Sequence, residues 1–582
     1  MCRSTRRLCI AASLVVVCAA FTSAMAYGEE PLEKPRTTIA LAKDKFLTGN
    51  YAAAAAIYRE ECDYCRRKYG ESDLRSAQML NNLAVVLHHR GEMTEAEKNA
   101  TKAFEYRREK LGATHPDTLT SENNLGLILH TVGDYTAAER HFRAVLDGRR
   151  KVLGADHPGT AQALNNLGCL LVTTGRFDDA EAAFKESLVI REKHSSDDEP
   201  GLAATLNNIA SLKLDLRDPQ ATDWVRRASV AGEKAFGGLH PMYAIVASNQ
   251  ARAERSTKEA RKLFARAMEI QTETGADSGP DHALLLNKIV DFHINAMDEH
   301  TVAPLAEKAV EECLKVFGRR SPATALAMNN LAIIEYAVRG NVTKAAGLLE
   351  ESAHINEAIL GQDHPAYAEN LVNLARIHRL TDNVALAESL EAKAFAIFGK
   401  KGNVEDPRVI SMQLNVAAYA VEKGNLDEAE RLYADALKKS VARFGHDDMY
   451  AATAMLGLGA VSCRLGREEQ GEKLLDDASG ILLGIRSAED LRLAMALLML
   501  GTSRCNLGRF DKALQPMQMS LAILESELPP TSAAIAACRE QLAKIYDKLG
   551  DPAAAAKLRE SATRSGASEE APESSPKDKH DT

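Results

Sequence analysis

The stretch ALNNLGCLLVTTGRFDDAEAAFKESLVIREK occupies residues Ala163–Lys193 and holds two apolar patterns separated by a glycine. In the first half, Leu164, Leu167 and Leu171 recur at the spacing of one helix face. In the second half, Phe, Ala and Leu recur with the same spacing. Gly175 lies between them, where a glycine can adopt the left-handed conformation that often ends a helix. The stretch therefore predicts a helix, a glycine turn and a second helix.

The Asn pair inside this stretch recurs along the chain, and its second member marks a repeating unit. The marker recurs at equal steps, at Asn82, Asn124, Asn166 and Asn208. The complete series of marker positions is Ala40, Asn82, Asn124, Asn166, Asn208, Asn249, Asn287, Asn330, Asn373, Asn415, Gly457, Met499 and Gln541. Its register is least defined around Asn249 and Asn287, where the steps between markers shorten. A series of this kind predicts about 13 copies of one helix pair.

A second break separates consecutive units and contains His followed by Pro. It appears as LGATHP before Asp117, as LGADHP before Gly159 and as LGQDHP before Ala366. Proline suits the first turn of a helix, where its missing N–H would have no partner. We therefore interpret His115, His157, His240 and His364 as structural residues of the loops between units.

The helix pair and its Gly-x-aromatic-x-x-Ala signature resemble the tetratricopeptide repeat. The 42-residue period, LNNLA, REK-LG and DHP resemble the kinesin light chain class of these repeats. The resemblance covers nearly all of residues 36–562. It implies an all-α fold, a right-handed α-solenoid of about 13 helix-turn-helix tetratricopeptide-like repeats, in which the first helices of successive units line a concave groove.

The two ends of the chain differ in composition from the repeats. Arg3, Arg6 and Arg7 precede an apolar run over residues 8–21, and Ala24-Met25-Ala26 offers a cleavage site, so residues 1–26 are predicted to be a signal peptide. Export to the bacterial periplasm or the extracellular space follows, and an uncleaved membrane anchor over residues 8–27 is the alternative. We expect a linker over residues 27–35. Residues 563–582 are rich in Ser, Pro and charge, which predicts a disordered tail.

Composition and missing motifs argue against several functions. The net charge is −9 and there is no long basic run, so no nucleic-acid partner is expected. HExxH, GxSxG and the phosphate-binding GxxxxGK[ST] are absent, and the repeats occupy most of the chain. We therefore predict no catalytic residue, no cofactor and no resident metal. Seven of the ten Cys lie beyond the signal segment, an odd number that does not indicate a disulfide framework.

Two Cys and two His have spacings that could indicate a metal or redox site. Cys62 aligns with core positions of other units, whereas Cys65 aligns with Arg107, Arg149 and Arg191, which we expect to be solvated. A pair divided between core and surface suits neither zinc nor redox chemistry. His88 and His130 lie six residues after their markers, where they could form a weakly polar groove wall or, alternatively, a metal site.

The candidate ligand-binding residues are the Asn columns and their groove neighbours. They are Asn81, Asn82, Asn123, Asn124, Asn165, Asn166, Asn208, Asn330, Asn373, Asn415, His88, His130, Arg376 and Arg379. The resemblance implies that the Asn amides contact the backbone of an extended peptide, because an amide offers both a donor and an acceptor. The alternative is that each Asn bonds to a neighbouring unit and fixes the stack. Of each pair the second Asn is the preferred ligand contact, because it persists at Asn373 and Asn415.

Groove positions three and six residues after the marker indicate the kind of ligand. In the four units with equally spaced markers, from Asn82 to Asn208, these positions hold Val85, His88, Leu127, His130, Cys169, Val172, Ser211 and Leu214. None is basic, and Arg376 and Arg379 supply positive charge only near Asn373. These positions favour a mixed polar and apolar peptide over an acidic one.

The function that this sequence predicts best is that of a non-enzymatic exported scaffold, which binds protein or peptide segments in its concave groove. One alternative is a structural or assembly component of an envelope complex that packs by its repeat faces. Another is a metal-binding or catalytic protein that uses the His cluster. A membrane is expected as a partner only if the N-terminal segment is an uncleaved anchor. The sequence does not define the oligomeric state.

Overall fold

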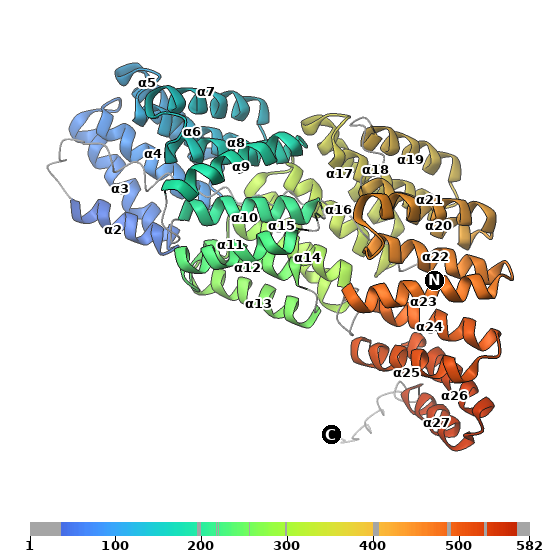
Figure 1. The fold of residues 1–582 in the computed structure, drawn as a ribbon. Helices are drawn as coiled ribbons and strands as arrows, with labels where there is room; N and C mark the ends of the chain where they lie inside the picture. Colours follow the sequence, from blue (N-terminus) through green and yellow to red (C-terminus); the bar gives the residue numbers. More distant parts are fainter. Residues whose placement is uncertain are drawn as a thin grey trace, which may run out of the picture. The chain divides into compact units, whose positions relative to one another are not determined.

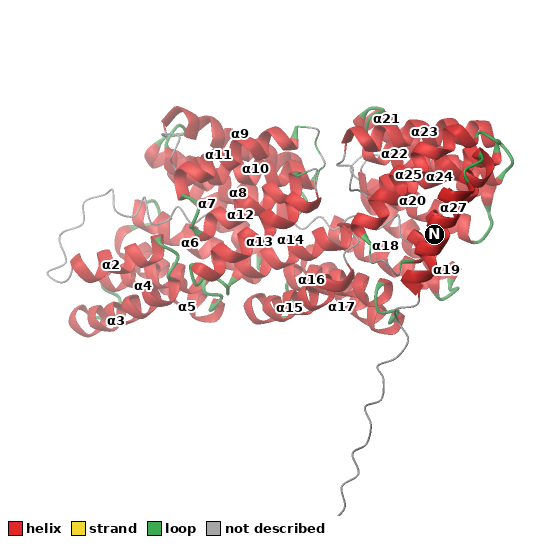
Figure 2. Ribbon diagram, turned by 90° about the horizontal axis from the view of Figure 1, so that it is seen from below, coloured by secondary structure: helices red, strands yellow, loops and turns green. Residues whose placement is uncertain are grey.

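The protein consists of helices joined by short connections, as seen in a computed structural model (Figure 1). The structure describes residues 36–194, 200–216, 218, 220–254, 257–296, 299–399, 407–485, 491–528 and 532–566. Within these residues there are 26 helices and no strand (Figure 2). The predicted signal peptide and linker lie outside the described residues.

The helices fall into two compact units, which are described separately. The N-terminal unit comprises residues Arg6–Glu254 and Lys258–Val404, and the C-terminal unit is formed mainly by Glu405–Thr582. The helices of the N-terminal unit are α2 (Arg36–Leu47), α3 (Tyr51–Tyr69), α4 (Leu74–His89), α5 (Met93–Leu111), α6 (Pro116–Val132), α7 (Tyr135–Leu153), α8 (Pro158–Thr173), α9 (Phe177–His194), α10 (Pro200–Asp215), α11 (Ala221–Phe236), α12 (Pro241–Ala253), α13 (Thr257–Glu273), α14 (Pro280–Ala296), α15 (Glu299–Phe317), α16 (Pro322–Ala337), α17 (Val342–Leu360), α18 (Pro365–Leu380) and α19 (Val384–Gly399). Those of the C-terminal unit are α20 (Pro407–Glu422), α21 (Leu426–Phe444), α22 (Met449–Arg464), α23 (Glu468–Ile485), α24 (Leu491–Asn506), α25 (Phe510–Glu527), α26 (Ala533–Leu549) and α27 (Pro552–Gly566).

Consecutive helices pair into the predicted repeats, so the α-solenoid fold is confirmed. The 26 helices form 13 pairs, numbered here as repeats 1 to 13 from α2 and α3 to α26 and α27. The last helix continues to Gly566, four residues into the segment predicted as a tail. Residues beyond Gly566 lie outside the described part of the chain.

The sequence signals for helix starts and ends act as expected. The His157 Nδ1 atom accepts a hydrogen bond of 3.0 Å from the Gly159 N–H and caps α8, whose first residue is Pro158. The first helices of repeats 1 to 4 end at Gly49, Gly91, Gly133 and Gly175, all with positive φ. Such glycines satisfy the helix end without the strain that a side chain would add there.

The glycine of LNNLG has a packing role inside its repeat. A Cβ atom added to Gly168 would lie 2.6 Å from Cε1 of Phe184, which is fully buried on the second helix of the same repeat. Gly126 meets Phe142 in the same way. The missing side chain therefore lets the two helices of the repeat approach closely.

A column of buried Arg connects consecutive repeats, contrary to the expectation that Arg107, Arg149 and Arg191 are solvated. All three are at most 4% exposed. The Arg149 guanidinium donates to the Gly159 carbonyl at 2.8 Å and to Gln162 Oε1 at 2.9 Å, both in the first helix of the next repeat. The prediction was wrong because Arg107 and Arg149 donate to backbone carbonyls of the next repeat, a contact that the sequence of one repeat does not reveal.

The structure also corrects the register of repeat 7. Its first helix begins at Pro280, eight residues before Lys288, and the same interval of eight separates Pro158 from Asn166. The marker of repeat 7 is therefore Lys288 and not Asn287. Lys288 is buried and donates to Ser248 Oγ at 3.2 Å.

Within the N-terminal unit, four contacts join repeats that lie five apart along the chain, and we call them the seam. The glycine turns of repeats 1 to 4 meet the loops that precede the first helices of repeats 6 to 9. In the fourth contact, His364 Nε2 lies 3.0 Å from the Thr173 carbonyl oxygen. A Cβ atom added to Gly175 would be 3.2 Å from Pro365.

The other three seam contacts repeat this arrangement. His240 bonds to the backbone of Leu47, and a Cβ atom on Gly49 would lie 2.6 Å from Pro241. The remaining contacts bring Gly91 against Gly279 and Gly133 against Arg320. In the C-terminal unit, by contrast, a Cβ atom on any of the equivalent Gly424, Gly466, Gly508 and Gly550 would meet nothing within 4 Å.

Candidate functional site

The Asn pairs of the N-terminal unit form a ladder of side-chain hydrogen bonds between repeats. In repeats 3 to 5 the second Asn of the pair donates to the first Asn of the preceding repeat, and Asn166 Nδ2 lies 2.9 Å from Asn123 Oδ1. Further rungs join Asn124 to Asn81, Asn208 to Asn165, Asn249 to Asn207 and Asn373 to Asn329. The Lys288–Ser248 bond occupies the same place in repeat 7. Both residues of the pair therefore have a structural partner.

Most of the predicted Asn residues are buried in the structure described. Asn81, Asn82, Asn123, Asn124, Asn165, Asn166, Asn208 and Asn330 are 0–6% exposed. For Asn81, Asn123, Asn124, Asn165, Asn166 and Asn208 the structure shows the bond of the alternative interpretation, in which the amide binds a neighbouring repeat. The preference for Asn166 over Asn165 also lapses, because one acts as donor and the other as acceptor in successive rungs.

His88 and His130 occupy matching places in repeats 2 and 3 and form a second series of contacts between repeats. His88 Nε2 lies 2.7 Å from Thr131 Oγ1, and His130 Nε2 lies 2.9 Å from Thr173 Oγ1. Burial lowers the pKa of His88 to about 3 and that of His130 to about 4. Each ring is thus held neutral by its surroundings. In the described part of the chain, no three His, Cys, Asp or Glu residues come together as a metal site.

The later predicted residues are more accessible. Asn373, Arg376 and Asn415 are half-buried, and the Arg376 guanidinium lies 5.4 Å from the centre of the Tyr336 ring. Arg379 is instead held in an ion pair with Glu391, with Nε 2.8 Å from Oε1. Arg379 is therefore not available as a free positive charge for a ligand.

The positions three and six residues after each marker, which we call the inner face, are closed in repeats 2 to 5 and more open in later repeats. In repeats 2 to 5, Val85, Leu127, Cys169 and Ser211 are at most 2% exposed. Half-buried residues occur there only at His130 and Leu214. The first helices of repeats 2 to 5 therefore leave little of this face to solvent, whereas Ile333, Tyr336 and Arg376 in repeats 8 and 9 are half-buried.

The inner face of the C-terminal unit is partly open. The side chains at its inner-face positions in α20, α22 and α24 are all half-buried, namely Ala418, Val421, Ala460, Cys463, Thr502 and Cys505. Leu456, Leu498 and Met499 lie beside them and are also half-buried, and Met495 is 37% exposed. Most of these side chains are apolar. Sequence reasoning missed this surface, although the replacement of the Asn pair by Leu498 and Met499 was a visible signal.

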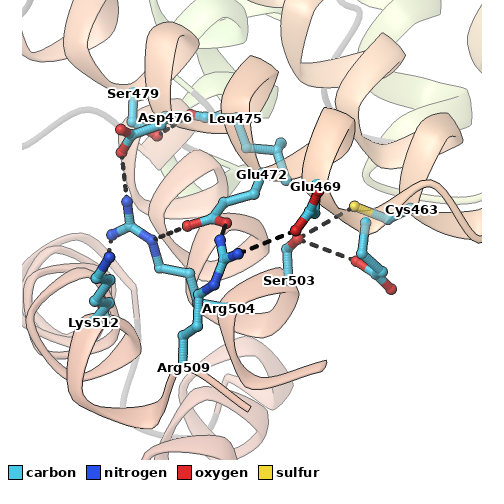
Figure 3. Close-up of polar contacts among 11 residues, drawn as sticks. Cys463, Glu469, Glu472, Leu475, Asp476, Ser479, Ser503, Arg504, Arg509 and Lys512 are labelled. Atoms are coloured by element: carbon cyan, nitrogen blue, oxygen red, sulfur yellow. Dashed lines mark hydrogen bonds and ion pairs between the residues drawn. The ribbon is translucent and has the colours of Figure 1, made fainter. Parts of the chain in front are cut away.

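An ion-pair network fixes the helices that carry this surface (Figure 3). Arg504 on α24 donates to Glu472 Oε1 at 3.0 Å and to Asp476 Oδ1 at 2.9 Å, both on α23 of the preceding repeat. Arg509 follows the next glycine turn and also binds Glu472, with Glu469 3.4 Å away. The network joins repeats 11 and 12, so it holds the half-exposed face in one arrangement.

The described cysteines are all free thiols, as expected for Cys463 and Cys505. The predicted placement of the CxxC pair was wrong. Cys65 is buried at 3% exposure, whereas Cys62 is half-buried. Cys65 occupies the same position in its repeat as Arg107, and this position is buried. The expectation that Cys65 is solvated was therefore wrong for the same reason as the expectation for the Arg residues. Burial raises the pKa of the Cys65 thiol to about 11, so it is protonated at neutral pH.

Comparison with known proteins identifies the repeats. Models described as tetratricopeptide repeat match residues 75–151, 121–193 and 492–565, and a second group matches 324–366 and 409–448. No curated protein matches the chain. In the described residues, no helix is both long and apolar enough to cross a bilayer.

Several solved structures are similar to parts of the chain. BtubC (BKLC) from P. vanneervenii is 20% identical with a TM-score of 0.37, over 42% of this chain and 97% of that chain. A putative kinesin light chain repeat protein from Podosopora anserina is 20% identical with a TM-score of 0.31, over 35% of this chain and 97% of that one. The Cut9-Hcn1 hetero-tetramer of APC/C is 14% identical with a TM-score of 0.41, over 96% and 98% of the two chains.

The chain is a tetratricopeptide repeat protein. More particularly, its 42-residue period and Asn pairs resemble those of the kinesin light chain class. Repeats of this kind generally mediate protein–protein interactions, and the fold they build is typically a non-catalytic scaffold.

Proposed function

We propose that the protein is an exported, non-enzymatic scaffold that binds a segment of a partner protein on the inner face of the C-terminal unit. The observation that carries this proposal is the row of half-exposed apolar side chains on α22 and α24, centred on Leu456, Met495 and Leu498. Apolar side chains that several neighbouring helices leave accessible are typical of protein-binding sites when they form a patch.

The chemistry of this face favours an apolar segment. No Lys, Arg, Asp or Glu occupies the inner-face positions of repeats 10 to 12, whereas repeat 13 has Lys544 and Asp547 there. Met and Leu side chains adapt their shape to a ligand, and Met is common at surfaces that bind varied apolar segments. An acidic peptide would find no matching charge at these positions.

Export is supported by the N-terminal sequence alone. Three Arg, an apolar run over residues 8–21 and the Ala24-Met25-Ala26 motif follow the order of a secretory signal. Mass spectrometry of the protein purified from its native host tests this part independently. A mature N-terminus at Tyr27 would support export with cleavage, and an intact Met1 would contradict it.

Site-specific photo-crosslinking tests the binding face. A benzophenone amino acid placed at Met495 should capture a partner in the native host, because this side chain lies on the proposed face. The matched control is Leu483, which is 49% exposed on α23, the second helix of repeat 11. The proposal requires one discrete adduct from position 495 and none of the same mass from position 483.

A competing variant completes this experiment. Ala460→Glu places a charge on the inner face one repeat away, and should abolish the adduct formed at position 495. Capture of the same partner from both positions, or an adduct unchanged by Ala460→Glu, would contradict binding at this face.

A further inference from the structure

The His-Pro loops act on two helices at once in the seam of the N-terminal unit. His364 Nδ1 accepts a hydrogen bond from the Ala366 N–H at 3.0 Å, so the ring hydrogen lies on Nε2. Nε2 then donates to the Thr173 carbonyl at the end of α8. One imidazole thus caps its own helix and binds the end of a first helix five repeats earlier.

Two further loops carry the same motif without a seam partner in the described part of the chain. His115 Nδ1 accepts from the Asp117 N–H at 3.2 Å, and His157 Nδ1 accepts from the Gly159 N–H at 3.0 Å. Their Nε2–H groups make no hydrogen bond within the described residues. The His115 side chain is 40% exposed.

Glycine turns like those of the seam are open to solvent in the C-terminal unit. Gly424, Gly466, Gly508 and Gly550 repeat the φ values of the seam glycines, between +72° and +83°, and have open space around them. In the seam, the accepting carbonyl lies two residues before the glycine, at Leu47 and Thr173. The equivalent carbonyls of repeats 10 and 12 belong to Glu422 and Asn506.

We propose that the seam is formed a second time, between two copies of this chain. The loops of His115-Pro116 and His157-Pro158 of one copy dock on consecutive glycine turns of the C-terminal unit of another. The argument is continuity with an interface that the chain already makes four times. His115 and His157 are 42 residues apart, and the same interval of 42 separates Gly424, Gly466, Gly508 and Gly550, so two consecutive loops match two consecutive turns. The contact joins two different surfaces, so it is head-to-tail and leaves one edge free at each end of the assembly.

The proposal is independent of partner binding on the inner face, because it uses loops and turns at the ends of the helices.

The test uses two full-length variants that each block one edge and keep the fold. His115→Ser with His157→Ser removes the donor rings but keeps the helix caps, since Ser321 and Ser532 cap first helices of this chain at the same place. Gly466→Asp with Gly508→Asp fills the other edge, and Asp382 already holds this turn position at φ 57° in repeat 9.

Sedimentation velocity over a wide concentration range gives the readout. The wild-type protein should increase in mean mass with concentration, beyond that of a dimer. Each variant alone should remain monomeric, and an equimolar mixture should form a 1:1 dimer through the one intact pair of edges. Wild-type protein that stays monomeric at every concentration would overturn the proposal. So would a mixture without dimer, or variants that assemble like the wild type.

Discussion

Removal of one rung of the Asn ladder should cost more stability than removal of both partners. Asn166 Nδ2 donates to Asn123 Oδ1 over 2.9 Å, and both side chains are fully buried. Asn166→Leu keeps the approximate volume but leaves the Asn123 oxygen without its donor. An unsatisfied buried acceptor costs about 1–3 kcal/mol, whereas replacing both partners by apolar groups of similar shape is nearly neutral. The double variant Asn123→Leu/Asn166→Leu should therefore be more stable than Asn166→Leu alone, by about 1 kcal/mol.

Urea unfolding of the full chain followed by circular dichroism measures this order of stabilities. Hydrogen exchange in α6 and α8 locates the change, because a long repeat array need not unfold in two states. Lys98→Leu is the control, since Lys98 is exposed in the interior of α5 in the same unit. If Asn166→Leu unfolded at the wild-type urea concentration, or if the double variant lost the sum of the single losses, the ladder would not be a structural device.

Three further outcomes are expected. Burial lowers the pKa of His88 to about 3 and that of His130 to about 4, so below pH 6.5 the unfolded chain binds more protons than the folded chain. Lowering the pH from 7 to 5 should therefore reduce the free energy of unfolding, measured by urea titration, by about 2 kcal/mol for each His. Replacement of both residues by Asn should remove this pH dependence. Gly175→Ala should lower the thermal midpoint more than Gly466→Ala. Both turns have φ above +70°, so the backbone strain is shared, but only Gly175 lies in the seam. Equal shifts of the midpoint would argue against the seam. Arg504→Ala should destabilise the C-terminal unit by about 2 kcal/mol, because it removes a guanidinium that binds two carboxylates. Arg504→Lys should recover little of this loss, because one ammonium group cannot replace that guanidinium. Full recovery in the Lys variant would contradict the role of Arg504 in joining the two carboxylates.

The repeat itself was predictable from the sequence because its signals are local. Helical spacing, the glycine after the first helix and the His-Pro loop each act within a few residues, so Gly175 and His157 could be assigned correctly. The wrong predictions concern contacts between repeats. Arg149 was expected to be solvated since it is charged, yet its guanidinium reaches the carbonyl of Gly159 in the next repeat. Lys288 was overlooked because an Asn precedes it and imitates the marker.

The candidate site could not be predicted from the period for a different reason. An identical inner-face position can be closed or open, depending on what packs against it. Cys169 and Thr502 both lie three residues after their markers, and only Thr502 retains solvent exposure. The seam joins Thr173 to His364, which are 191 residues apart. A pattern that recurs once in each repeat contains no information about a contact between repeats so distant along the chain.

The most direct test of the central claim is the rate at which a small thiol reagent labels the native cysteines. The claim is that the inner face is closed in repeats 2 to 5 of the N-terminal unit and accessible in the C-terminal unit. Cys169 reports on the first and is 0% exposed, while Cys463 and Cys505 report on the second and are half-buried. Burial raises the pKa of all three thiols, so each rate is compared with that of the same peptide in urea-unfolded protein. Labelling of Cys463 and Cys505 in the folded protein, with Cys169 protected until unfolding, is the predicted result. Labelling of Cys169 as fast as Cys505 would contradict the account.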